Sequence, residues 1–204
     1  MIQMQKQKSL FPTHQTMSHK LFCIIGVSGV GKTTVRNHIV KRKSAIEYLP
    51  SYTTRPPRQN EINGNDYFFI SKPEFEKLIS DNELLEWEKH FGNYYGISKQ
   101  RFSEKMQSGI SVIKEIAIGG YQQIVDSLKS NINVYTIYIL PENIYDVLDR
   151  LSIRGDQDRE ERRKSFLKDF DSKALCNSIV ISRQDKLEEL CHEVEIIITK
   201  ELNK

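Results

Sequence analysis

The sequence predicts an α/β fold in which helices flank a parallel sheet, and two patterns point to it. From residue 19 onward, short apolar runs alternate with stretches of helical periodicity, an order that is typical of a parallel sheet covered on both faces. The first apolar run leads into a glycine-rich turn and then a helical pattern, which is how a βαβ unit begins. The 204 residues are enough for one well-buried core and few for two independent ones.

The N-terminal part of the chain contains a tail and the first strand-helix unit. Residues 1–18 are polar, rich in glutamine and aperiodic, which predicts a flexible tail. Met17 within it is a second candidate for the start of translation, and the sequence does not decide between the two. The apolar run at 21–25 predicts a strand buried on both faces. After the glycine-rich turn, apolar residues at helical spacing predict a helix whose inward face carries Val35, Ile39 and Val40.

The character of the sequence changes between residues 51 and 97, which contain Pro-Pro, Asn-Gly and many aromatic residues. A helix is expected near the middle, because Ser71 and Glu74 have the spacing of a capping box. It lies between two expected strands, at 67–70 and 84–87. We interpret this stretch as a small inserted lobe, and the predicted boundaries are 51–97 for the lobe and 19–50 plus 98–204 for the core.

Strands and helices alternate again after the lobe. The segment at about 155–165, which begins with Gly155, is almost wholly charged, and its apolar content is too low for it to pack by itself. The other expected elements are a helix at 98–108, a strand at 111–118, a helix at 122–128, a strand at 134–140, helices at 142–153 and 166–175, a strand at 178–181 and a last helix at 185–202.

Charge, hydropathy and cysteine content argue against several classes of protein. The 30 basic and 27 acidic residues give a net charge of +3, so we expect no nucleic-acid partner, which needs a clustered basic face. No apolar run reaches the roughly 20 residues of a membrane-spanning helix, so we expect no membrane partner.

The three cysteines, Cys23, Cys176 and Cys191, lack metal-ligand spacing. They predict reduced thiols in a cytoplasmic protein. The sequence does not indicate an oligomeric state.

A phosphate-binding loop follows the first strand. The motif G-x-x-x-x-G-K-[ST] is complete and is placed between a strand and a helix, as its chemistry requires. Its glycines allow backbone N–H groups to surround phosphate oxygens, Lys32 brings a positive charge to the β- and γ-phosphates, and Thr33 offers a hydroxyl to Mg²⁺. The motif therefore predicts binding of a nucleoside triphosphate with Mg²⁺ by Gly26, Val27, Ser28, Gly29, Val30, Gly31, Lys32, Thr33 and Thr34, and the resemblance described below implies that this triphosphate is ATP.

A second anion site is indicated by Arg55 and Arg58, which lie on a segment stiffened by Pro56 and Pro57. The planar guanidinium group of arginine pairs with two phosphate oxygens at once. Beside a phosphate loop, two such groups suggest a phosphorylated acceptor. On this segment alone, a solvated basic loop is an equally good interpretation.

Several motifs together resemble guanylate kinase. They are Ser-Tyr-Thr-Thr-Arg-Pro-Pro-Arg at 51–58, Glu-Ile-Asn-Gly-Asn-Asp-Tyr at 61–67, Glu-Leu-Leu-Glu-Trp at 83–87, Gly-Asn-Tyr-Tyr-Gly at 92–96, and Arg-Leu-Ser-Ile-Arg-Gly at 150–155. The resemblance runs from about residue 21 to 202. It implies a P-loop kinase fold, in which a monophosphate-binding lobe and a mobile helical lid are inserted into the core. The lid would be the charged segment at about 155–165.

The resemblance also implies roles for individual residues. Arg55, Arg58, Tyr67 and Tyr95 would hold the phosphate of the nucleoside monophosphate, while Ser51 and Glu86 would face its base. Glu115 would orient a water bound to Mg²⁺, so the implied metal residues are Thr33 and Glu115. The implied catalytic residues, which neutralise charge during transfer, are Lys32, Arg55, Arg150 and Arg154, the last two gripping the triphosphate as the lid closes.

The base pocket departs from the family pattern. Ala117 replaces an aspartate and Ile97 replaces a serine or threonine, so two polar groups that face guanine are missing. Glu115 replaces the first aspartate of the same family motif. Lys114 is unusual within a strand, where it would lie at a sheet edge or pair with a carboxylate. We therefore expect guanine to remain the best base, with weaker discrimination than the family shows.

The expected activity is ATP-dependent phosphorylation of a nucleoside monophosphate, GMP or dGMP, to the diphosphate. One alternative is a kinase for a different small phosphorylated acceptor, which Ile97 and Ala117 would favour. Another is a non-catalytic interaction module of guanylate kinase type. The presence of Lys32 and Thr33 argues against this module, because such modules characteristically lose the lysine of the phosphate loop.

Overall fold

The computed structural model describes residues 19–90, 92–128, 132–147 and 176–204. Several sequence expectations lie outside these residues. They are the tail at 1–18, the lid at about 155–165, the helix at 166–175, the part of helix 142–153 beyond residue 147, and the side chains of Arg150 and Arg154.

A five-stranded parallel sheet forms the core, as the sequence predicts. Its strands follow the order β2-β7-β1-β8-β9, and every neighbouring pair is parallel. The central strand β1 is buried along its whole length, which explains why its sequence is a continuous apolar run. The strands are β1 (Lys20–Ile25), β2 (Ile46–Tyr48), β7 (Ser111–Glu115), β8 (Asn133–Pro141) and β9 (Ser178–Ser182).

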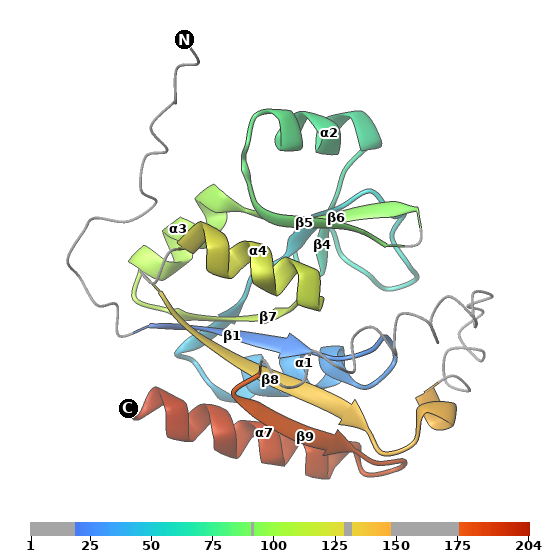
Figure 1. Cartoon of the computed structure of the whole chain (residues 1–204), viewed down its shortest axis with the longest axis vertical. Helices are drawn as coiled ribbons and strands as arrows, with labels where there is room; N and C mark the ends of the chain where they lie inside the picture. The colour runs from blue at the N-terminus through green and yellow to red at the C-terminus, as the bar shows by residue number, and fades with distance from the viewer. Residues whose placement is uncertain (1–18, 91, 129–131, 148–175) are drawn as a thin grey trace.

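Helices cover both faces of this sheet (Figure 1). Side chains alternate between the faces of β1: Phe22 and Ile24 join the apolar cluster beneath α1 and α7, whereas Leu21, Cys23 and Ile25 join the cluster beneath α3 and α4. The helices are α1 (Lys32–Arg42), α3 (Lys99–Gln107), α4 (Ile118–Leu128) and α7 (Leu187–Leu202). Across the described residues, no helix combines the length and apolar composition needed to cross a membrane.

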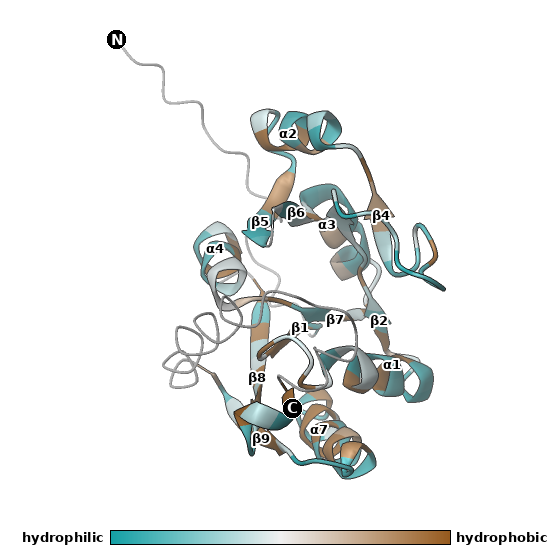
Figure 2. Cartoon of the chain, turned by 90° about the vertical axis from the view of Figure 1, so that its right-hand side faces the viewer, coloured by the Kyte–Doolittle hydropathy of each residue, from teal (hydrophilic) through white to brown (hydrophobic). Residues whose placement is uncertain are grey.

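A second sheet of four strands, in the order β4-β3-β6-β5, lies beyond α3 and α4 (Figure 1). Helix α2 (Lys72–Ser80) packs on it, and it begins with the predicted capping box of Ser71 and Glu74. The apolar side of α2 faces the sheet, and its outer side is hydrophilic (Figure 2). The strands are β3 (Ser51–Thr53), β4 (Tyr67–Phe69), β5 (Leu84–His90) and β6 (Asn93–Ser98).

The structure corrects the sequence analysis in two places. The sequence does not predict β2, β3 or β6, because two of them have only three residues and β6 contains Gly96, which weakens a strand signal. The expected strand at 111–118 is too long and the following helix too short. The strand ends at Glu115, opposite Ile24 of β1, because β1 turns into the phosphate loop soon afterwards, and α4 starts at Ile118.

We expect that replacing Phe75 by alanine lowers the free energy of unfolding by about 3–5 kcal/mol. The ring of Phe75 is fully buried under α2 and stacks on Tyr94, with 5.2 Å between the ring centroids. Chemical denaturation measures the change. Val125→Ala, at a site where 39% of the residue is exposed, is the control, and an equally small effect at both sites would contradict the packing of α2.

Candidate active site

The phosphate loop connects β1 to α1 in a shape that only glycine adopts easily. Gly26 has a φ of 150°, and a Cβ atom there would approach the carbonyl oxygen of Ile139 to 2.6 Å. Gly31, immediately before α1, has a φ of 110°. The backbone can therefore turn tightly at the N-terminus of α1, where the helix dipole favours an anion.

Lys32 is the first residue of α1, and its side chain folds back over the loop. Its Nζ donates to the carbonyl oxygens of Gly26 and Val27, at 2.5 and 2.8 Å. These contacts hold the ammonium group against the loop. The oxygens of a bound phosphate would compete with the two carbonyl oxygens for the N–H donors of Lys32. Val27 and Val30 are buried and anchor the loop, whereas Ser28, Thr33 and Thr34 are exposed.

The two residues predicted to serve the metal are in contact. The Oγ1 of Thr33 donates to Oε2 of Glu115 at 3.0 Å, although the residues are 82 positions apart in sequence. Parallel pairing brings them together, because β7 ends beside the point where β1 enters the loop. Mg²⁺ prefers oxygen ligands and is usually held by one or two protein groups with phosphates and water, so this pair fits that ion.

Four of the six predicted acceptor residues lie on one face of the second sheet. Ser51 pairs with Tyr67 across β3 and β4, and Glu86 pairs with Ile97 across β5 and β6. Tyr95 lies two residues before Ile97, hence on the same face, and it pairs with Thr53, two residues after Ser51. The strand register therefore brings Ser51, Tyr67, Glu86 and Tyr95 together.

Arg55 is held beside this face by Glu61. Its Nη2 and Nη1 donate to the two carboxylate oxygens of Glu61, at 2.8 and 3.0 Å, and its guanidinium lies 5.4 Å from the ring centroid of Tyr67. Burial alone would lower the pKa of Arg55, but the hydrogen bonds and charge of Glu61 outweigh it, so the pKa is raised. Glu61 also accepts the backbone N–H of Arg58 at 2.6 Å, and it thereby orders both predicted phosphate-binding residues.

Glu86 is a buried carboxylate between β5 and the first turn of α4, and only 7% of the residue is exposed. A Cβ atom on Gly120 would lie 2.6 Å from its Oε2, so glycine is needed there. The next residue on this face, Glu88, similarly occupies the space beside Gly119. Burial raises the pKa of Glu86 to about 7, although the positive charge of Lys114 opposes the rise. Ionising Glu86 therefore costs stability as the pH rises from 4.5 to about 7.

Lys114 is also fully inside the protein. It lies in β7, between β2 and β1, so the expectation of a sheet edge is wrong. Its Nζ donates to the carbonyl oxygen of Leu49 at 2.7 Å and lies 4.7 Å from the ring centroid of Tyr48. Burial lowers its pKa to about 8, with Glu115 and Glu86 opposing that change. The charges of Glu115 and Glu86 act on Lys114, but its hydrogen-bond acceptors among the described residues are the carbonyl oxygen of Leu49 and the hydroxyl of Tyr48 rather than a carboxylate.

Sequence reasoning missed two charged residues at the site. Glu61 belongs to the motif at 61–67 that resembles the family, but the resemblance implies no role for it. Arg36 lies at helical spacing among the inward residues of α1, next to Val35 and one turn from Ile39. A cation on an apolar helix face is the signal that could have identified it.

Comparison with known proteins agrees with this arrangement. A family model described as guanylate kinase matches residues 18–201. The chain belongs to the guanylate kinase family. The guanylate kinase of Bacillus subtilis (strain 168) is 34% identical over 185 residues, which are 89% of this chain and 88% of that protein. The guanylate kinase of Nostoc sp. is 40% identical over 145 residues, 71% of each chain.

A solved structure supports the guanylate kinase fold. The crystal structure of guanylate kinase from Anaplasma phagocytophilum has a TM-score of 0.74 to this chain, with coverage of 91% of this chain and 87% of the other at 23% identity. The resemblance seen in the sequence and the P-loop kinase fold are thus confirmed. The enzyme class implied by this family, a nucleoside monophosphate kinase, is confirmed as well.

We expect the pKa of Glu86, followed by NMR as a function of pH, to lie near 7, and Lys114→Met to raise it further. The mutation removes the buried positive charge that favours the ionised carboxylate. Lys72→Met, on an exposed turn of α2, is the control and should leave the titration unchanged. A lower pKa in Lys114→Met would show that the two groups do not interact as the structure indicates.

Proposed function

We propose that this protein transfers the γ-phosphoryl group of ATP to GMP or dGMP, producing ADP and GDP or dGDP. The observation that carries the proposal is the buried carboxylate of Glu86 on the acceptor face of the second sheet. A carboxylate accepts from the N1–H and the exocyclic amine of guanine together. Adenine has no N1–H, so it would leave an acceptor without a donor, which is costly in a buried pocket.

Residues of the core would bind the triphosphate. Backbone N–H groups of the loop at 26–31 would surround its phosphates, and Lys32 would neutralise charge on the β- and γ-phosphates. Mg²⁺, when bound, supplies further neutralisation of the phosphate oxygens. The Oγ1 of Thr33 would hold the ion, and Glu115 would orient its water. Placement in the cytoplasm is part of this proposal.

Residues of the lobe would bind and orient the acceptor. Arg55, Arg58, Tyr67 and Tyr95 would hold its phosphate, so that the attacking oxygen lies in line with the γ-phosphate. Phosphoryl transfer needs mainly positioning and charge stabilisation from the protein. We assign charge stabilisation to Lys32 and Arg55, and to Arg150 and Arg154, which lie outside the described residues.

The test is an ADP-release assay with ATP and a panel of GMP, dGMP, IMP, AMP, CMP and UMP. We expect GMP and dGMP to be the best acceptors, and Lys32→Ala, the matched inactive control, to lose turnover while it remains folded. Neither Ile97, which is 1% exposed, nor Ala117 carries a polar side chain. Ala117→Asp should therefore increase the preference for GMP over IMP, which lacks the exocyclic amine. Faster turnover of another monophosphate would overturn the proposal.

We expect Arg55→Ala to weaken GMP binding by about 1.5–3 kcal/mol, roughly 10- to 150-fold in Kd. The mutation removes a charged hydrogen-bond donor from the acceptor clamp and leaves Glu61 without its guanidinium partner, while the phosphate loop is unchanged. Calorimetric titration of GMP and of ATP separately measures the effect. Arg42→Ala, with a side chain that is 59% exposed at the end of α1, is the control. Equal losses of affinity for GMP and for ATP would show that Arg55 does not belong to the acceptor site.

A further inference from the structure

Arg36 is a buried cation for which the mechanism above has no role. It lies on α1, one turn beyond Thr33, and only 5% of the residue is exposed. Its Nε lies 3.3 Å from Oε1 of Glu115 and donates to Oδ1 of Asn37 at 3.1 Å. Its Nη2 lies 3.9 Å from Oδ1 of Asp66. One guanidinium group therefore faces two carboxylates from distant parts of the chain.

These two carboxylates belong to different parts of the site. Glu115 ends β7 of the core sheet, and its other oxygen accepts the hydroxyl of Thr33 at 3.0 Å. Asp66 immediately precedes β4 of the second sheet, and its Oδ2 accepts the backbone N–H of Ile62 at 2.9 Å, which fixes its orientation. Arg36 thus connects the oxygen atoms predicted to serve Mg²⁺ with the lobe predicted to bind the acceptor.

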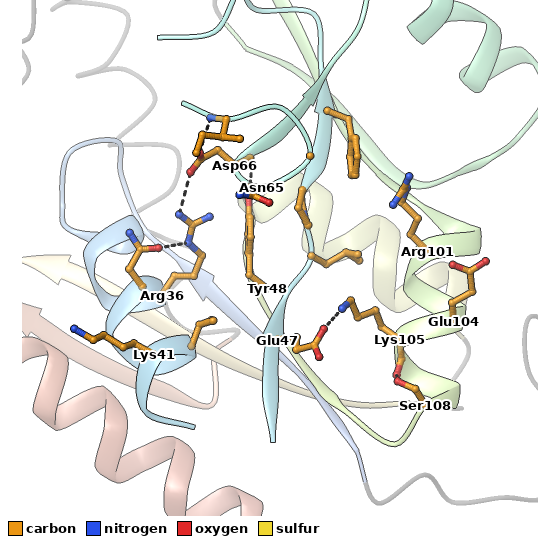
Figure 3. A pocket seen from close by; sticks show the side chains of 17 residues that line it. Arg36, Lys41, Glu47, Tyr48, Asn65, Asp66, Arg101, Glu104, Lys105 and Ser108 are labelled. Carbon is orange, nitrogen blue, oxygen red and sulfur yellow. Dashed lines mark hydrogen bonds and ion pairs between the residues drawn. The ribbon is translucent and has the colours of Figure 1, made fainter. Parts of the chain in front are cut away.

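Tyr48 completes the connection at the point where the chain leaves the core sheet. Its ring centroid lies 3.9 Å from the guanidinium carbon of Arg36, and its hydroxyl donates to the carbonyl oxygen of Asp66 at 2.9 Å. All three residues line a cavity of about 910 Å³ beside β2 (Figure 3). The planar guanidinium of arginine stacks on a ring with its face while its five donors point outward in a fixed fork, and the compact ammonium group of lysine does not reproduce this geometry.

We propose that Arg36 is a positioning residue that couples the placement of the acceptor lobe to the orientation of Glu115 beside Thr33. Movement of the lobe displaces Asp66, and the shared guanidinium transmits that displacement to Glu115. Binding of the acceptor to the lobe and binding of the magnesium-nucleotide to the core then strengthen one another. The inference rests on the proposed function, because it requires an acceptor that binds the lobe.

The test measures this coupling by calorimetry without turnover. The affinity for a non-hydrolysable ATP analogue with Mg²⁺ is determined with and without saturating GMP, and the ratio of the two affinities is the coupling factor. We expect a wild-type factor in the usual range for coupled sites, about 5- to 150-fold. In Arg36→Lys the factor should fall below about twofold, although each ligand alone still binds, because lysine keeps the charge but does not reproduce the geometry of the guanidinium.

Two further variants separate coupling from simple stabilisation. Asp66→Asn should lower the factor as Arg36→Lys does, and combining the two mutations should lower it no further, because both remove the same contact. Arg101→Lys is the matched control. Its guanidinium is also stacked on an aromatic ring, 4.0 Å from the centroid of Phe68, and it lines the same cavity. Among the described residues, however, the ion pairs with Asp66 and Glu115 are made by Arg36 and not by Arg101. This variant should keep the wild-type factor.

The outcomes distinguish the two proposals. A wild-type factor near one, an unchanged factor in Arg36→Lys, or an equal loss in Arg101→Lys would overturn the role of Arg36 while GMP binding itself upholds the acceptor site. Wild-type protein that binds no GMP when GMP is titrated alone would overturn the proposed function, and with it the coupling that depends on it.

Discussion

The site depends on the parallel pairing of β1 with β7. Because the two strands run in the same direction, their carboxyl ends meet at one edge of the sheet, which is where ligands bind in open α/β folds. Ile24 lies opposite Glu115, and two residues later the chain enters the phosphate loop at Gly26. This register, rather than any local sequence preference, places the hydroxyl of Thr33 within hydrogen-bond distance of a carboxylate 82 residues away.

The second sheet applies a different constraint to the acceptor residues. The pleat sends alternate side chains to opposite faces, so Glu86, Glu88 and His90 of β5 share one face with Tyr95 and Ile97 of β6. Trp87 and Tyr94 point to the other face, where the ring of Tyr94 stacks on Phe75 of α2. One face is thus used for anchoring α2, and the other is left for polar side chains. A slip of one residue in the register would exchange the two sets.

Three of the five buried charged residues that the structure describes interact across the core and the second sheet. Glu86, Lys114 and Arg36 are each less than 10% exposed, and taking such groups out of water is costly unless they are paired. Each has partners: Glu86 and Lys114 act on one another, and Arg36 faces Glu115 and Asp66. Both cations also lie over the ring of Tyr48. Apolar residues would often stabilise such positions as well or better, so this arrangement is better explained by binding than by stability.

The sequence by itself determined the fold class, the phosphate loop and most strands and helices of the core, because each is encoded over a few consecutive residues by periodicity, capping or a glycine pattern. It also indicated Arg55, Glu86 and Glu115 through motifs of fixed spacing. Only the tertiary structure decided where α4 begins. Two consecutive glycines argue against a helix, but Gly119 and Gly120 lie in its first turn because the carboxylates of Glu88 and Glu86 occupy the space that a side chain would need. The tertiary structure likewise decided that Glu61 holds Arg55 and that Arg36 reaches Glu115, since both contacts require the chain to be folded back on itself. The pKa of Glu86 was set in the same way, because burial is a property of the assembled fold and not of any segment.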